Sequence, residues 1–132
     1  MVAKMRQRLA GDERGFTLIE LLVVIIIIGI LLAIAIPSYL KFKDRANASA
    51  AQANIRAAVP GIEAFNADNG ATGYSGVTVT KLQADYDAGI KGIVVKSASA
   101  TTYCVQSTVG TKTFHKAGPS AAIAEGACPA TA

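Results

Sequence analysis

Hydrophobic and polar positions divide the chain into successive patterns, of which the first is an almost unbroken apolar run. Residues 16–36 contain one charged side chain, that of Glu20. A helix rises about 1.5 Å per residue, so a run of this length crosses a hydrocarbon core of roughly 30 Å. The run therefore predicts one membrane-spanning helix. No second run of comparable hydrophobicity follows it.

Helix-forming residues continue beyond the apolar run. Alanine and other strong helix formers dominate residues 41–59, which predicts one long helix that includes Pro37 and Pro60. Each proline removes a backbone donor and can kink the helix. Further along, apolar residues recur on a single helical face at Ile55, Ala58, Val59, Ile62 and Phe65. Such a stripe needs a cover, and the C-terminal region is the predicted one.

The pattern changes after Asn69-Gly70, a helix stop that is followed by a loop over residues 70–76. Residues 78–86 predict a short helix, with Thr80 and Gln83 at the spacing of a capping box. Short β-branched or aromatic runs then predict antiparallel strands over residues 92–97, 101–107 and 112–116, joined by hairpins. The fold class is therefore α+β, a long helix packed on a sheet of three to four strands.

The two cysteines lie in the last quarter of the chain. They could be free buried thiols, but an even pair in a small domain suits an oxidising exterior. The tail over residues 117–132 has too few large apolar residues to order itself. A bond between Cys104 and Cys128 would stabilise it by about 3 to 4 kcal/mol on the chain-entropy account. We therefore expect this disulfide, with residues 41–132 outside the cytoplasm.

Basic residues flank the apolar run on both sides. Those before it could form the basic region of a cleaved secretory signal, but the run is too long for one and ends in Pro37-Ser-Tyr rather than a small-x-small site. The positive-inside rule favours a cytoplasmic N-terminus only weakly, because Lys41, Lys43 and Arg45 follow the run. These three are more simply neighbours of lipid headgroups than of nucleic acid. The net charge of +4 belongs partly to the leader, which weakens a nucleic-acid interpretation further.

Candidates for catalysis and metal binding are few. The single histidine, His115, is predicted as a solvated strand residue rather than a base or ligand. Asp85 and Asp87 lack the further ligands of a calcium loop, and the cysteines lack zinc spacing. Asn47-Ala-Ser matches the glycosylation acceptor but falls in a predicted helix. We expect no catalytic residues, no metal and no cofactor.

Glu20 is the exception among the charged residues. A carboxylate in an apolar run costs up to about 2.5 to 3.5 kcal/mol at the bilayer centre, so it invites a functional interpretation with a named partner. The alternative is that Glu20 lies only about 6 Å past Phe16 and reaches back to the interface.

The segment Arg14-Gly-Phe-Thr-Leu-Ile-Glu-Leu-Leu, after a short basic leader and before a span ending in Pro37-Ser-Tyr, closely resembles the signature of type IV prepilins. The resemblance is tight over residues 12–45. The remainder agrees with the family in layout: a long helix, a loop, an antiparallel sheet and a C-terminal disulfide loop.

The resemblance implies a leader over residues 1–15, a membrane and filament-core helix over 16–40 and a periplasmic or extracellular domain over 41–132. A membrane prepilin peptidase would cleave after Gly15, and Phe16 would be N-methylated. Glu20 would pair with the Phe16 amine of a neighbouring subunit, which favours processed chains because a buried carboxylate without a partner is costly.

The same resemblance implies that the helix loses regular hydrogen bonding between Gly29 and Pro37 in filaments, although ordinary kinks explain these residues equally well. It predicts a single-pass precursor in the cytoplasmic membrane and, with inner-membrane assembly machinery, a homo-oligomeric helical filament at the cell surface.

Two alternatives remain open. One is a type II secretion or competence pseudopilin, although the major secretion member typically has an acid-rich calcium loop and residues 117–132 contain one acidic residue, Glu125. The other is a membrane-anchored module that binds DNA or another ligand, which leaves Gly15, Phe16 and Glu20 without a purpose. DNA binding could also coexist with filament formation, and the sequence does not separate adhesion, motility, DNA uptake and conduction.

Overall fold

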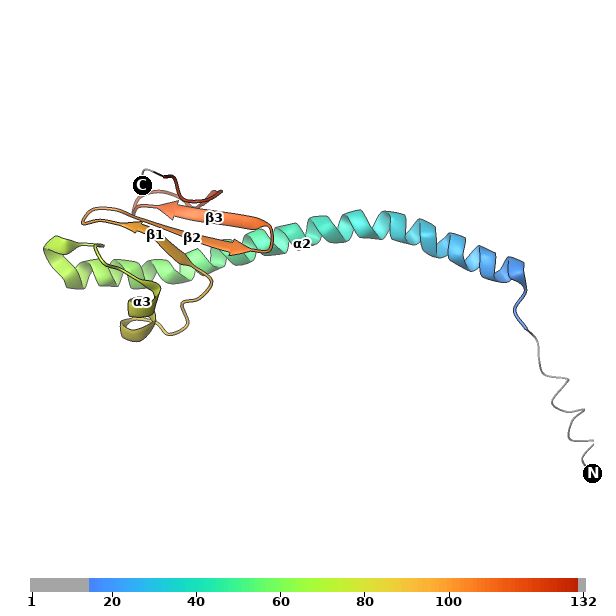
Figure 1. Cartoon of the computed structure of the whole chain (residues 1–132), viewed down its shortest axis with the longest axis horizontal. Helices are drawn as coiled ribbons and strands as arrows, with labels where there is room; N and C mark the ends of the chain where they lie inside the picture. Colours follow the sequence, from blue (N-terminus) through green and yellow to red (C-terminus); the bar gives the residue numbers. More distant parts are fainter. Residues whose placement is uncertain (1–14, 131–132) are drawn as a thin grey trace, which may run out of the picture. The chain divides into compact units, whose positions relative to one another are not determined.

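The computed structural model describes residues 15–130 (Figure 1). The predicted leader therefore lies outside the described residues, apart from Gly15. In chain order the elements are α2 (Leu18–Asn69), the 3-10 turn η1 (Gly70–Thr72), α3 (Val79–Asp85), β1 (Val94–Ala98), β2 (Tyr103–Val109), β3 (Lys112–Ala117) and β4 (Ala124–Glu125). The predicted α+β class is confirmed. Contacts divide the chain between Leu40 and Lys41 into two units, and α2 runs through both.

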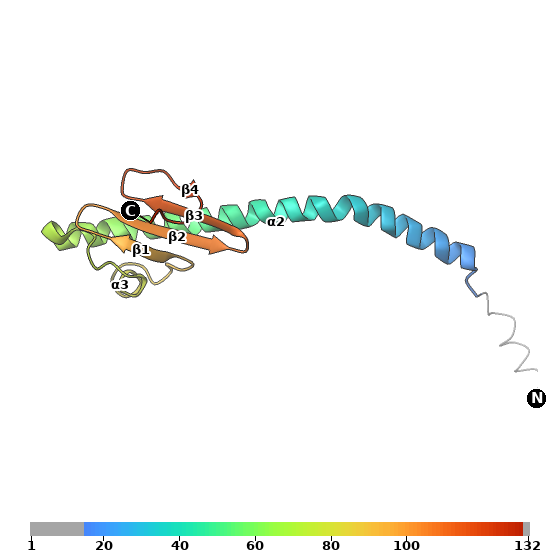
Figure 2. The ribbon, with the colours of Figure 1, turned by 45° about the horizontal axis from the view of Figure 1, so that its top comes forward.

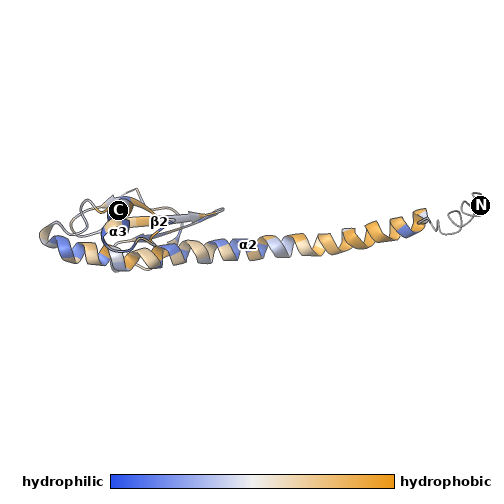
Figure 3. Cartoon of the chain, turned by 90° about the horizontal axis from the view of Figure 1, so that it is seen from below, coloured by the Kyte–Doolittle hydropathy of each residue, from blue (hydrophilic) through white to orange (hydrophobic). Residues whose placement is uncertain are grey.

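The first part of α2 is apolar on every side (Figure 3). Its large apolar side chains from Leu18 to Phe42 are between 48% and 88% exposed. By length and composition, α2 is the one helix in the described part of the chain that could cross a membrane. A helix that is hydrophobic all round needs a lipid or protein environment to cover it.

The later part of α2 buries a single stripe, as the sequence predicts. Ala51, Ile55, Ala58 and Ile62 are fully buried, and Phe65 is 5% exposed. These positions recur every three or four residues and so lie on one face of the helix. Val59 lies at the side of the stripe and is only half-buried.

The sheet covers this stripe. Its order is β1-β2-β3-β4, all neighbours are antiparallel, and in two views it lies along the second half of α2 (Figures 1 and 2). Ile93, Tyr103, Val105 and Phe114 contribute buried side chains from the sheet and its approach. The first two predicted strands begin too early, whereas β3 begins where it was predicted, and the two-residue β4 is the fourth strand that the prediction allowed.

The boundaries of α3 correct one sequence prediction. Its N-cap is Thr78, whose side-chain oxygen accepts a hydrogen bond from the Lys81 backbone nitrogen at 3.3 Å. The capping box predicted from Thr80 and Gln83 is therefore wrong. Gln83 instead donates to the Ile90 carbonyl at 2.6 Å, because the chain that follows α3 folds back within reach of its amide.

A polar link fastens α2 to the sheet. Asn54 Nδ2 donates to Ser107 Oγ at 3.2 Å, and the Ser107 hydroxyl donates to the Gly92 carbonyl at 2.6 Å. Ser107 is 1% exposed, so an unpaired hydroxyl there would be costly. The link therefore joins the helix, β2 and the approach to β1 through groups that satisfy one another.

Candidate functional site

The predicted cleavage position lies just before the start of α2. Gly15, Phe16 and Thr17 precede the first helical residue, and the Phe16 side chain is 90% exposed. A side chain added at Gly15 would meet nothing within 4 Å. Packing against the described residues 15–130 therefore does not require glycine at this position.

Thr17 and Glu20 form a reciprocal capping box at the first turn of α2. The Glu20 backbone nitrogen donates to Thr17 Oγ1 at 3.2 Å, and the Thr17 backbone nitrogen donates to Glu20 Oε2 at 3.3 Å. The Thr17 hydroxyl also approaches Glu20 Oε2, at 3.4 Å. Two backbone donors that a helix N-terminus leaves free are thus satisfied, and a carboxylate there is favoured by the helix dipole.

This cap gives Glu20 a role within one chain that the sequence analysis missed. The signal was readable, because Thr17-Leu-Ile-Glu20 has the S/T-x-x-E spacing of a capping box. Cleavage between Gly15 and Phe16 would leave the Thr17 peptide nitrogen intact. The cap therefore survives cleavage, while an amine appears one residue before it.

Gly29 and Pro37 both lie within the unbroken helical assignment of α2. A Cβ added at Gly29 would meet no other atom within 4 Å, so the chain itself does not need glycine there. Pro37 cannot donate to the Ala33 carbonyl, which weakens the ladder locally. The single chain shows no loss of helix between these residues, and the irregularity stays a prediction for the filament.

Cys104 and Cys128 form a disulfide with Cα atoms 6.0 Å apart. The bond ties a buried residue of β2 to the C-terminal segment. The Cys128 backbone nitrogen also donates to Gln106 Oε1 at 3.1 Å, and Gly126 donates to the Thr113 carbonyl at 2.8 Å. The predicted C-terminal disulfide loop is therefore fastened by backbone contacts as well as by sulfur.

His115 also contacts the C-terminal disulfide loop. It is half-buried in β3, and its Nδ1 lies 2.9 Å from the Gly126 carbonyl oxygen. His115 therefore lies in a strand, as predicted, but is less solvated than expected, because β4 pairs beside it with Ala124 opposite His115. A neighbouring ion pair joins Lys112 Nζ to Glu125 Oε1 at 3.1 Å.

The remaining candidates do not converge on a reactive site. Asp87 Oδ1 accepts from the Gly89 backbone nitrogen at 2.7 Å and thereby stabilises a turn. Within residues 15–130, no group of three or more histidine, cysteine or acidic side chains could hold a metal ion. Asn47 lies in α2, half-buried, close against Gly110 of the β2–β3 turn. The exposed Lys41, Lys43 and Arg45 follow the apolar part of the helix.

Comparisons with known proteins bear on the first turn and on the whole chain. Residues 11–36 match the family model described as the prokaryotic N-terminal methylation motif. The chain is similar to the type IV wide pilus major component PilA4 of Thermus thermophilus, with 37% identity over 94 residues that cover 71% of this chain and 72% of that protein.

Two further relatives match over shorter stretches. The type IV major pilin protein PilA of Myxococcus xanthus is 58% identical over 45 residues, 34% of this chain and 20% of that protein. The type II secretion system core protein G of Pseudomonas aeruginosa is 37% identical over 58 residues, 44% of this chain and 41% of that protein. The chain thus spans less than half the length of these two relatives. The chain carries a methylation motif at the start of an exposed apolar helix, and this helix continues into a small sheet domain. The similarity to PilA4 extends over most of both chains. These findings together place this chain in the type IV pilin family.

Proposed function

We propose that this chain is the structural subunit of a type IV pilus, stored in the cytoplasmic membrane and assembled through its N-terminal helix into an extracellular filament. The observation that carries the proposal is the first part of α2, whose large apolar side chains from Leu18 to Phe42 are all at least 48% exposed. Side chains of this kind need an apolar environment around the helix. A bilayer supplies it in storage, and other copies of the same helix supply it in a fibre.

The proposal assigns the first residues to processing. Prepilin peptidase removes residues 1–15, and Phe16 becomes the N-methylated first residue. The exposure of Gly15 and the absence of any contact to its Cβ position support this, because glycine there serves a peptidase cleft and not the chain's own packing. The cytoplasmic N-terminus and the external residues 41–132 follow from the same arrangement.

Glu20 then acts in two settings. In the single chain its carboxylate caps α2 through Thr17. In the filament it also neutralises the Phe16 amine of a neighbouring subunit, in surroundings where an unpaired charge is costly. Gly29 and Pro37 allow the intervening helix to loosen there, since glycine and proline are the weakest helix formers.

The decisive experiment examines sheared surface fibres by electron microscopy and their subunit by intact mass spectrometry. We expect fibres built of a chain that begins at methylated Phe16. Gly15→Leu should block cleavage and leave precursor in the membrane, whereas Gly29→Leu, a matched change at another open glycine, should leave cleavage intact. Fibre subunits that retain residues 1–15 would overturn the processing scheme.

A pseudopilin role is the second candidate, because the similarity to type II secretion core protein G supports it. The two are separated by the cellular product. A pilus subunit yields long surface fibres whether or not a secretion system is present. Fibres that appear only when secretion components are overproduced would favour the pseudopilin.

A further inference from the structure

The long free edge of the sheet is β1. Of the two edge strands, β4 has two residues and β1 has five. Among the described strands, β1 pairs only with β2, so the backbone groups on its other side have no strand partner. An edge of this kind is a template for one more strand.

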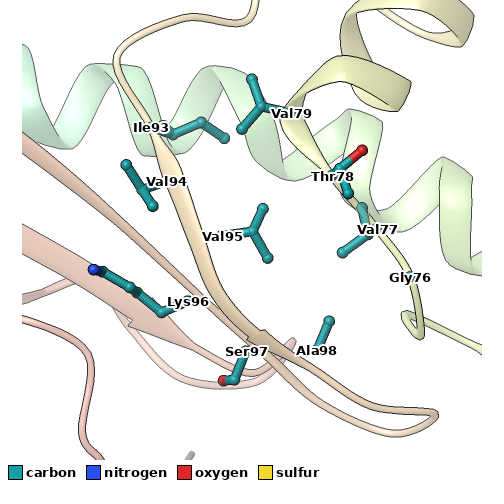
Figure 4. Close-up of a pocket in the computed structure, with 10 residues that line it drawn as sticks. All are labelled: Gly76, Val77, Thr78, Val79, Ile93, Val94, Val95, Lys96, Ser97 and Ala98. Atoms are coloured by element: carbon teal, nitrogen blue, oxygen red, sulfur yellow. The ribbon is translucent and has the colours of Figure 1, made fainter.

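An apolar groove of about 440 Å³ runs beside this edge, between β1 and residues 76–79 at the start of α3. Val77, Val79, Val95 and Ala98 point into the space between the two segments (Figure 4). The groove has the volume of a ligand site and an apolar lining, as peptide-binding grooves do. A strand added to β1 would place every second side chain in it.

The side chains on the opposite face of β1 include a charged one. Val94 and Lys96 are also part of the groove lining, but their side chains point to the other side of the strand, and both are exposed (Figure 4). Lys96 lies at a β-bulge, where the register with β2 shifts between Val95 and Ser97. No carboxylate lines the groove, and the ion pair found in the described chain, Lys112 with Glu125, lies on other strands. The edge therefore presents an uncompensated positive charge at its centre.

These features select among possible occupants. Antiparallel pairing of β1 with β1 of a second copy would bring two Lys96 side chains together, and like charges on paired strands are unfavourable. An incoming strand that carries acidic side chains on the Lys96 face would instead gain a favourable cross-strand pair. Its alternate side chains, which enter the groove, must be apolar.

We propose that the β1 edge is a docking site for an extended segment of another protein in which apolar residues alternate with acidic ones. The segment adds antiparallel or parallel to β1, fills the groove with its apolar side chains and sets an acidic side chain beside Lys96. This activity goes beyond filament assembly, because none of its residues belongs to the first turn of α2.

The test uses the full chain as a detergent-solubilised monomer and a fluorescently labelled peptide of alternating valine and glutamate. Fluorescence anisotropy should show saturable binding. Lys96→Glu replaces an attraction by a repulsion and should weaken binding by about tenfold. Lys91→Glu is the matched control, because Lys91 is exposed and lies outside the groove lining. It makes the same change in net charge and should leave binding within about twofold.

Two control peptides separate strand addition from simple attraction of charge. Replacing each glutamate by glutamine keeps the pattern and should weaken binding to a similar extent as Lys96→Glu. Replacing the central valine by proline keeps the charge but removes a backbone donor, so it should abolish binding. Hydrogen exchange should slow at the amides of residues 94–98 when the valine–glutamate peptide is bound.

Several results would overturn the proposal. One is the absence of saturable binding. Another is a loss of affinity with Lys91→Glu equal to that with Lys96→Glu. A third is binding of the proline peptide as tight as that of the valine–glutamate peptide. Sedimentation that shows the unsubstituted chain dimerising, with slowed hydrogen exchange at residues 94–98 in the dimer, would also overturn it, by making the occupant a second copy. Near-ultraviolet circular dichroism verifies that each variant is folded. Because the monomer is used, failure here leaves the fibre test untouched, and failure of the fibre test leaves this one valid.

Discussion

Two stretches of the same helix carry apolar residues in two different patterns. From Leu18 to Phe42 they occur on every side of α2, and the large ones are at least 48% exposed. From Ala51 to Phe65 the buried ones occur on one face and are at most 5% exposed. The comparison shows that two stretches of one continuous helix can be suited to different surroundings. One sheet is enough to cover an apolar stripe on one face of a helix. A helix that is apolar all round is covered only by lipid or by several neighbouring helices.

The largest expected effect tests the exposed stretch. Glu20→Gln keeps a side chain that can complete the capping box with Thr17 but deletes the charge. Fibre yield should therefore fall by more than about tenfold, while the amount of processed chain in the membrane stays unchanged. Sheared fibres are quantified against total mature protein. Glu125→Gln, which removes only an exposed ion pair, is the matched control. Normal fibre yield from Glu20→Gln would restrict this residue to capping.

The packed stretch ends in a turn that offers a matched pair of glycines. Gly70 and Gly73 both have positive φ, of 53° and 55°, so alanine is strained at each; ψ of −124° takes Gly73 outside the left-handed helical region and adds to its strain. A Cβ at Gly70 meets nothing, whereas one at Gly73 would lie 1.8 Å from the Ala100 carbonyl oxygen. Gly73→Ala should therefore lower the free energy of unfolding by more than about 4 kcal/mol, and Gly70→Ala by about 1 to 2. Equal denaturant midpoints would contradict the close contact.

The two patterns of α2 can be compared directly by one substitution made twice. Ile55 is fully buried, and Ile55→Ala should cost about 2 to 5 kcal/mol of unfolding free energy through the lost transfer energy and the cavity. Ile25 is 57% exposed, and Ile25→Ala should change the stability of the sheet domain by less than about 0.5 kcal/mol. Denaturant unfolding in detergent, followed by near-ultraviolet circular dichroism, measures both. A large effect of Ile25→Ala would mean that the two stretches do not act separately.

The disulfide should contribute less to the free energy of unfolding than Gly73 does. Replacing Cys104 and Cys128 together by alanine removes a cross-link between residues separated by 24 positions, worth about 3 kcal/mol. Part of the loop should remain in place, because Gly126 and Cys128 keep their backbone hydrogen bonds to β3 and β2. Limited proteolysis should then cut within residues 118–130 faster than in the parent. Unchanged proteolysis would show that the backbone contacts suffice.

The smallest expected effect is a dependence on alkaline pH that belongs to the packed unit. Burial, together with the hydrogen bond that Tyr74 donates to Glu63 at 2.8 Å, raises the pKa of Tyr74 to about 12 from 10.0. The folded chain therefore holds a proton that the unfolded chain releases first. Its stabilisation is complete below pH 10 and is lost as the pH rises toward 12. Denaturant midpoints measured across this interval should decline.

Tyr74→Phe should make that decline shallower. Tyr86→Phe is the comparison, since Tyr86 also has its pKa raised to about 12, through its hydrogen bond to Asp68, but lies nearer solvent. Tyr86→Phe should change the slope of the denaturant midpoint against pH less than Tyr74→Phe does. A slope that is the same in the parent and in Tyr74→Phe would remove Tyr74 as its source.

Local sequence signals were sufficient for the helix, its end and the class of fold. The alanine-rich composition of residues 41–59, the Asn69-Gly70 stop and the β-branched or aromatic runs of the three longer strands are each signals carried by a few neighbouring residues. The stripe from Ile55 to Phe65 was likewise readable, because helical periodicity needs no knowledge of what covers it. The apolar run and the Gly15-Phe16 junction are equally local.

Choices between competing local partners depended on the tertiary structure. Thr78 and Thr80 could each have capped α3, and the extended approach that buries Val77 favoured Thr78. The engagement of Glu20 with Thr17 is different, because the two residues lie three positions apart and their S/T-x-x-E spacing was readable without the tertiary structure. His115 took its surroundings from β4, a strand of two residues that pairs only after the chain has returned across the sheet.

The sequence by itself thus determined which segments are helix, strand and apolar anchor, since those preferences are local. Only the tertiary structure decided which distant polar groups meet, as in the Asn54–Ser107–Gly92 link, and which edge of the sheet stays open, because those contacts join residues far apart in the chain.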